Sequence, residues 1–112
     1  MLHTLNDYPK VKAQFEEWLK EEAPRFTYIN EEKICFTQRG VSWMLIQPLP
    51  IEQLYLTLFA EAEGYKIREE RYRNDNGSYW LWRIYDGSSA AYVLPTFPEA
   101  FAKFCQIKEQ EL

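Results

Sequence analysis

Residues 65–94, YKIREERYRNDNGSYWLWRIYDGSSAAYVL, decide the fold. Two strand-like runs over 65–73 and 79–85 flank Asp75-Asn76-Gly77, and these turn residues tolerate the positive φ that a tight hairpin needs. Asp86-Gly87 then turns the chain into a third run over 90–94. Because loops this short join antiparallel neighbours, the segment is predicted to form a three-stranded meander.

A similar meander is predicted nearer the N-terminus, from runs over 26–29, 33–37 and 41–47 with a turn at Arg39-Gly40. Three helices flank the two meanders. The first follows Asp7 as its N-cap and ends before Pro24, and the second runs from Pro50 to a cap at Gly64. The third begins in the capping box Thr96-Phe97-Pro98-Glu99. We expect a single α+β domain over residues 1–112, an antiparallel sheet with three helices in the order α-β-β-β-α-β-β-β-α.

Each predicted helix has an apolar stripe that marks its buried face. The stripes are Val11, Phe15, Trp18 and Leu19; Ile51, Leu54, Tyr55, Leu58, Phe59 and Ala62; and Phe97, Phe101, Phe104 and Cys105. Leu56 lies off the second stripe, so we expect that helix to be covered on more than one side. The polar residues 108–112 are expected to fray.

The composition is that of a folded, acidic domain. The 112 residues are 46% hydrophobic and 17% aromatic, which suffices for a core without disulfides or a metal. Thirteen Lys and Arg against 17 Asp and Glu give a net charge of -4, which opposes binding to nucleic acid or to an anionic membrane. The N-terminal residues lack a signal-peptide pattern, and the apolar runs, such as Met44-Leu45-Ile46, are too short for a membrane span. We therefore expect a cytoplasmic protein.

No pattern in the chain is typical of an active site or a metal site. The one histidine, His3, lies in a terminal segment expected to be loose, so it is a poor candidate for a general base. Cys35 and Cys105 lack metal-ligand spacing and are expected to be buried, reduced thiols, with a mutual disulfide left open. Adjacent glutamates point apart on helices and strands and are expected at the solvated surface. We expect no enzymatic activity, no cofactor and no metal.

The second strand of the hairpin has aromatic or aliphatic residues on both of its faces, whereas a half-exposed strand should have one polar face. A period of two places Trp80, Trp82 and Ile84 on one face of residues 79–85. The opposite face carries Tyr79, Leu81, Arg83 and Tyr85. In one interpretation the Trp80 face packs on the helices, and Arg and Lys stems from the neighbouring strand cover the other face.

In the other interpretation a Tyr/Arg surface stays exposed for a protein partner, because both residue types are enriched at interfaces. Its candidate binding residues are Tyr72, Tyr79, Leu81, Arg83, Tyr85, Arg68, Arg71 and Arg73.

These features favour a non-enzymatic protein-binding domain of a chaperone-like, adaptor or immunity type. Its partner can be a second copy, because a homodimer readily covers an aromatic strand face or an open sheet edge. The alternative is a small-molecule-binding domain with a pocket between sheet and helices, in which Arg83, Glu69 and Tyr72 supply polar groups. A third hypothesis is single-stranded nucleic-acid binding, in which tyrosines stack on bases and arginines contact phosphates.

In size, acidity and element order, the chain is similar to the type III secretion chaperones, which are non-catalytic dimers that hold a segment of a client protein. Small acidic immunity or inhibitor proteins have a similar profile. The similarity implies a non-enzymatic, protein-binding role. It assigns no residue to a site, because a function has to be argued from a site and not from a fold.

Overall fold

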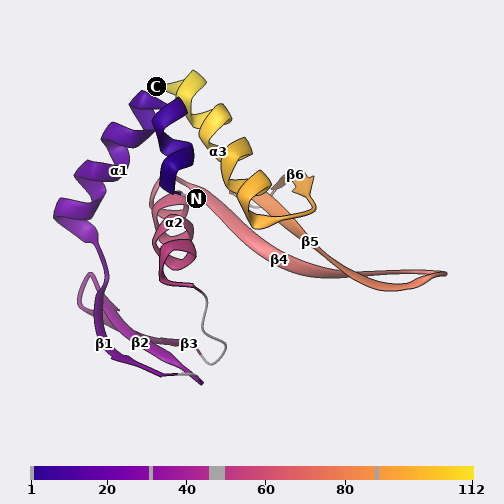
Figure 1. Cartoon of the computed structure of the whole chain (residues 1–112), viewed down its shortest axis with the longest axis horizontal. Helices are drawn as coiled ribbons and strands as arrows, with labels where there is room; N and C mark the ends of the chain where they lie inside the picture. Colours follow the sequence, from indigo (N-terminus) through magenta and orange to yellow (C-terminus); the bar gives the residue numbers. More distant parts are fainter. Residues whose placement is uncertain (1, 31, 46–49, 88) are drawn as a thin grey trace.

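The computed structural model describes residues 2–30, 32–45, 50–87 and 89–112. Its elements are the 3-10 helix η1 (Leu2–Asp7), α1 (Pro9–Glu22), β1 (Arg25–Ile29), β2 (Ile34–Gln38), β3 (Val41–Leu45), α2 (Ile51–Ala62), β4 (Tyr65–Asn74), β5 (Gly77–Asp86), β6 (Ser89–Leu94) and α3 (Phe97–Glu111) (Figure 1). The predicted α+β class and element order are confirmed, with η1 in addition. The predicted strand over 41–47 is described as far as Leu45, and its last two residues lie outside the described residues.

The described strands form two separate sheets, β1-β2-β3 and β4-β5-β6, where one antiparallel sheet was expected. Each sheet is an antiparallel meander, as the short turns predict. Arg39 and Gly40 adopt φ values of 55° and 76° at the β2–β3 turn. At the β4–β5 turn, Asn74 pairs with Gly77. Both hairpin predictions are therefore confirmed.

The larger core lies between the helices and the β4-β5-β6 sheet. Phe59 of α2 is fully buried, and its ring centroid lies 5.2 Å from that of Phe15 in α1 and 5.9 Å from that of Phe104 in α3. From the sheet side, Ile67 and Ile84 close this core. The predicted stripes supply most of its residues; the exceptions that remain exposed are Leu19, Ile51 and Ala62.

A smaller core joins the β1-β2-β3 sheet to α2, where Ile34 and Phe36 of β2 pack with Leu54. Leu56, on the other side of the same helix, is fully buried in the larger core. The expectation that α2 is covered on more than one side is therefore confirmed, because this helix packs on both sheets.

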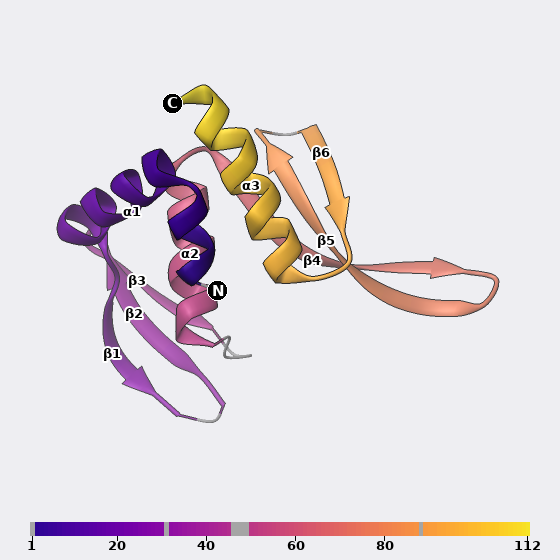
Figure 2. The ribbon, with the colours of Figure 1, turned by 45° about the horizontal axis from the view of Figure 1, so that its top comes forward.

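The two sheets lie on opposite sides of α2 and diverge, which gives the molecule an arched outline (Figures 1 and 2). The helices cover only the part of β4 and β5 that is nearest to them. The rest of the β4–β5 hairpin projects past α3, and its turn lies far from the other elements.

The described residues near both ends of the chain are helical, where the sequence predicts a loose N-terminal and a fraying C-terminal segment. Residues 2–7 form η1, in which Leu5 is buried, and α3 continues to Glu111. The Tyr65 hydroxyl donates a hydrogen bond to Glu111, which is the main cause that raises the pKa of Tyr65 to about 12. Lys108 forms an ion pair with Glu63 at 3.4 Å.

The N-terminus of α1 is capped from a distance. Tyr8 occupies the N-cap position without a side-chain cap of its own, so the prediction of Asp7 as N-cap is wrong by one residue. The Glu109 carboxylate of α3 instead accepts hydrogen bonds from the backbone N–H groups of Lys10 and Val11, at 3.1 and 2.9 Å. A negative charge at this position also complements the helix dipole.

Glu109→Ala should lower the free energy of unfolding by about 1 kcal/mol, because the first turn of α1 loses its hydrogen-bond acceptor. Glu109→Gln keeps an acceptor oxygen and should lower the free energy of unfolding by less than Glu109→Ala does. Gln110 is exposed in the same turn of α3, so Gln110→Ala is the matched control and should stay within about 0.5 kcal/mol of the wild type. Urea denaturation measures all three variants, and equal effects of the two alanine variants would contradict the cap.

Candidate protein-binding site

The distal half of the β4–β5 hairpin, residues 70–81, is called the arm from here on. Glu70 pairs with Leu81 at its base, and Asn74 pairs with Gly77 at its tip. Gly77 adopts a φ of 124°, a conformation that side-chain-bearing residues rarely take, which is why glycine closes the turn. Because side chains alternate along a strand, the arm has a helix-facing side and an outer side.

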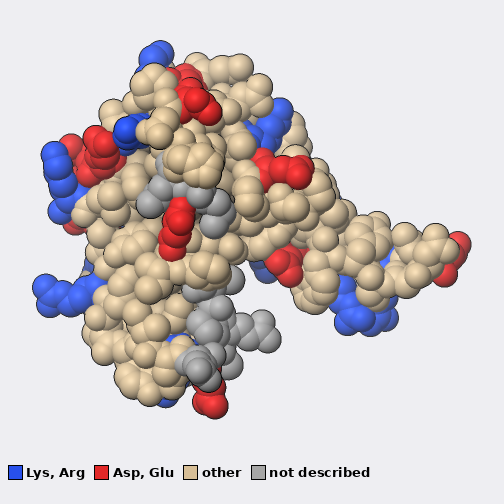
Figure 3. All heavy atoms as spheres, in the orientation of Figure 1, with Lys and Arg blue, Asp and Glu red and all other residues tan. Residues whose placement is uncertain are grey.

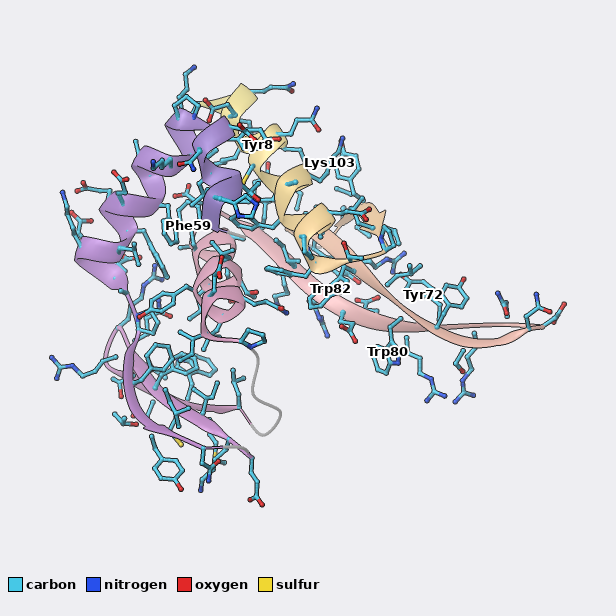
Figure 4. The ribbon with its side chains drawn as sticks, viewed as in Figure 1. Tyr8, Phe59, Tyr72, Trp80, Trp82 and Lys103 are labelled. Carbon is cyan, nitrogen blue, oxygen red and sulfur yellow. The ribbon has the colours of Figure 1, made fainter. Side chains whose placement is uncertain are left out.

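The helix-facing side of the hairpin loses its cover at Trp80. Trp82 still packs edge-on against Phe97 of α3, with 5.1 Å between ring centroids. Two residues farther out, Trp80 is 57% exposed, and Figure 4 shows its side chain extending from β5 away from the helices. Arg71 stands opposite Trp80 and donates a hydrogen bond to the Ser78 hydroxyl at 3.1 Å.

On the outer side of the arm, the aromatic rings are partly covered by one another and by Arg83. Tyr72 stacks on Tyr79 with 5.9 Å between ring centroids. The Arg83 guanidinium lies 5.4 Å from the ring centroid of Tyr72 and 6.0 Å from that of Tyr85, within cation–π range. Tyr72, Arg83 and Tyr85 are half-buried as a result, whereas Tyr79 remains 42% exposed at the end of the stack.

Glu70 is the charged centre of the outer side. Its carboxylate accepts hydrogen bonds from the Tyr85 hydroxyl and from Arg83 Nη1, the latter at 3.4 Å. The hydrogen bond from Tyr85 is the main cause that holds the pKa of Glu70 below its usual value; burial opposes it, and the charge of Arg83 lowers the pKa further. Burial raises the pKa of Tyr72, whose hydroxyl oxygen has no hydrogen-bond partner among the described residues.

The register divides the predicted binding residues between the two sides. The outer side brings together Tyr72, Tyr79, Leu81, Arg83, Tyr85 and Arg68. Arg71 and Arg73 lie on the helix-facing side with Trp80 instead of with the tyrosines. This division could have been predicted from the sequence, because side chains alternate between the two sides of a strand and Arg71 and Arg73 alternate with Tyr72.

A second surface is an apolar cleft between β3 and α2, called the groove below, whose residues the sequence does not single out. Its volume is about 520 Å³, within the range typical of binding pockets. Trp43 and Val41 of β3 line it and remain 55% and 50% exposed. Val41, Trp43 and Leu45 show the period of two that marks a covered strand face, but the sequence does not reveal that α2 covers this face only in part.

The groove lies between a sheet and a helix, as the alternative prediction expects, but the residues named for that pocket are elsewhere. Arg83 and Tyr72 lie on the outer side of the hairpin. Glu69 stands opposite Trp82 on the helix-facing side. These three side chains therefore do not converge on one cavity.

The two cysteines are the remaining candidate reactive groups. Cys105 is a buried free thiol, and burial is the main cause that raises its pKa to about 12. Cys35 is also a free thiol but is only half-buried, so the expectation of two buried cysteines holds for one of them.

In the part of the chain that the structure describes, no three His, Cys, Asp or Glu side chains are placed to hold a metal ion. No described helix has the length and apolarity needed to cross a membrane.

Glu70→Gln should destabilise the protein at pH 7, and this effect should shrink as the pH falls below about 4.5. A carboxyl group with a lowered pKa in the folded state stabilises the fold above its ordinary pKa of 4.5, and the contribution is lost as the pH falls through the lowered value. Urea midpoints measured from pH 7 to pH 3 follow the effect. Glu69→Gln, an exposed neighbour on the opposite side, is the control. A Glu70→Gln effect that does not depend on pH would refute the charge network.

Comparisons of this chain with protein-family models, with curated proteins and with solved structures give no match.

Proposed function

We propose that this chain is a non-enzymatic protein-binding domain and that the arm is its interaction element. The observation that carries the proposal is the exposure of Trp80, a large aromatic side chain held past the end of the helices that cover Trp82. Chaperone-like, adaptor and immunity-type roles all fall within this proposal, because they differ in the partner and not in the binding surface.

The residue types of the arm are those that dominate binding energy at protein interfaces. Trp80 lies on one side with Arg71 and Arg73, and Tyr79 lies on the other. Tryptophan, tyrosine and arginine are the residue types most enriched among interface hot spots. A hairpin that presents them on both sides can be enclosed by a partner and bury them together.

The arm is also ordered before it binds. The Tyr72–Tyr79 stack and the hydrogen bonds of Glu70 to Tyr85 and Arg83 fix side chains that would otherwise lose rotamer freedom on association. An immobilised side chain of this kind costs on the order of 0.5–1.5 kcal/mol when binding itself has to order it. The outer side of the arm therefore supports binding even where its rings are half-buried.

The groove favours a second candidate function, the binding of a small apolar molecule between β3 and α2. An apolar fluorescent dye should then gain emission on binding, and Trp43→Lys should abolish this gain by placing a charge in the groove. Trp80→Ala leaves the groove intact and should keep the gain. Equal losses in both variants would contradict binding in the groove.

Photo-crosslinking from the arm tests the proposed function. A photoreactive phenylalanine analogue at position 80 or 79 should give discrete protein adducts in cells, because both side chains are exposed where a partner would bind. The analogue at Ala13, exposed on α1, is the matched control and should give none of these adducts. Mass spectrometry identifies the products. Failure of positions 79 and 80 to give adducts, or nuclease-sensitive adducts only, would count against a protein partner.

A further inference from the structure

We propose that the arm binds a second copy of this chain and that Trp80 enters the groove of that copy, while the second arm enters the groove of the first. The inference rests on the proposed function of the arm and names its partner. It is carried by two apolar surfaces that the isolated chain leaves open and by the charges around them.

The groove has the size and the lining that an indole ring needs. Its volume of about 520 Å³ is bounded by buried Phe36 and Leu54 and by half-buried Leu45 and Leu58. Trp43 is exposed in the same groove, so an entering Trp80 would cover a second indole as it is itself covered. A tryptophan can bury on the order of 150–250 Å² in such a contact. Each contact would therefore remove large apolar surfaces of both copies from water.

The charges on the two surfaces are complementary. Arg71 and Arg73 share the helix-facing side of the arm with Trp80, and Figure 3 shows basic residues gathered along one side of the projecting hairpin. Glu61 lines the groove, and Arg39, which also lines it, is paired with Glu22. The entering aromatic side chain would therefore bring two positive charges towards a groove with a negative one.

More carboxylates lie near one end of the groove, in a second hollow that shares Ala62 with it. Glu17 and Glu21 line this hollow together with Glu22 and Glu63, which are already paired with Arg39 and Lys108. A hydrogen bond to Glu17 and the charge of Glu17 raise the pKa of Glu21, which indicates that the carboxylates of Glu17 and Glu21 are crowded. A basic side chain that approaches this end would relieve their repulsion.

The arrangement of arm and groove suits a two-fold dimer. In Figure 1 the β4–β5 hairpin and the β3 edge of the first sheet border the same concave side of the arch, and in Figure 4 Trp80 extends into that side. A two-fold axis makes such a contact reciprocal, since each copy supplies one arm and one groove. The assembly then closes at two copies and leaves neither arm exposed.

Other assemblies would use different residues. β3 and β6 are edge strands of their sheets, and a dimer formed by pairing sheet edges would not need Trp80. A different protein bound to the arm would leave this chain monomeric in isolation.

Sedimentation velocity of the full chain distinguishes these cases. The wild type should dimerise at micromolar concentration, and Trp80→Ala and Trp43→Lys should each raise the Kd of the dimer at least about tenfold. Val93→Ala removes an exposed apolar side chain from β6 and should leave the Kd unchanged. Val41→Lys places a charge in the same groove and replaces Trp43→Lys if circular dichroism shows that the latter does not fold.

Mixing the two variants is the decisive step. Trp80→Ala keeps an intact groove and Trp43→Lys keeps an intact arm, so a mixed pair can form one of the two reciprocal contacts. A fluorescently labelled Trp80→Ala chain should therefore associate with unlabelled Trp43→Lys more tightly than either variant associates with itself.

Three results would overturn the inference: a monomeric wild type, a dimer insensitive to Trp80→Ala, or a mixture that associates no better than its components. A monomer whose position 80 crosslinks to another protein would overturn this inference and leave the proposed function standing. The lack of any protein adduct from the arm would overturn both.

Discussion

The Phe59 side chain fixes the layout of the molecule. From the middle of α2 it touches Phe15 and Trp18 of α1 and Phe104 of α3, with ring centroids 5.2 to 5.9 Å apart. One fully buried ring thereby holds three helices in a single layer over the base of β4 and β5. Removing such a ring typically costs about 3–5 kcal/mol, a large part of the stability of a small domain. The position of this layer decides which strand residues are covered and which are not.

Both candidate surfaces arise because the layer of three helices is too small to cover the inner faces of both sheets completely. The helices reach Trp82 and stop short of Trp80, so the hairpin continues into solvent as the arm. On the other side, Leu54 of α2 packs on Ile34 and Phe36 of β2 and leaves Trp43 partly uncovered, which creates the groove. Each described strand is thus paired with a neighbour, yet the indole rings of Trp80 and Trp43 remain exposed to water. A partner of complementary shape and charge would cover both the arm and the groove.

The sequence predicts the local structure well because turns and caps are local. Asp75-Asn76-Gly77 determines the hairpin register, and Thr96 accepts a hydrogen bond from the Glu99 amide as the capping box requires. Long-range pairings are not predictable in this way: Glu109 caps a helix about 98 residues away. The groove escapes prediction for the same reason, since the period of Val41 and Trp43 indicates a covered face but not the extent of its cover. Composition alone groups Arg71 and Arg73 with the tyrosines, although their alternation with Tyr72 places them on the other side of the strand.

The arm is uncovered in one copy of the chain, and we infer that an assembly of two copies covers it. Hydrogen–deuterium exchange of the wild type at dilute and at high protein concentration measures this directly. We expect residues 70–81 of the arm, together with β3 and α2, to exchange more slowly at high concentration, while β6 is unchanged. Exchange of the arm that is the same at both concentrations, or protection confined to β6, would contradict it.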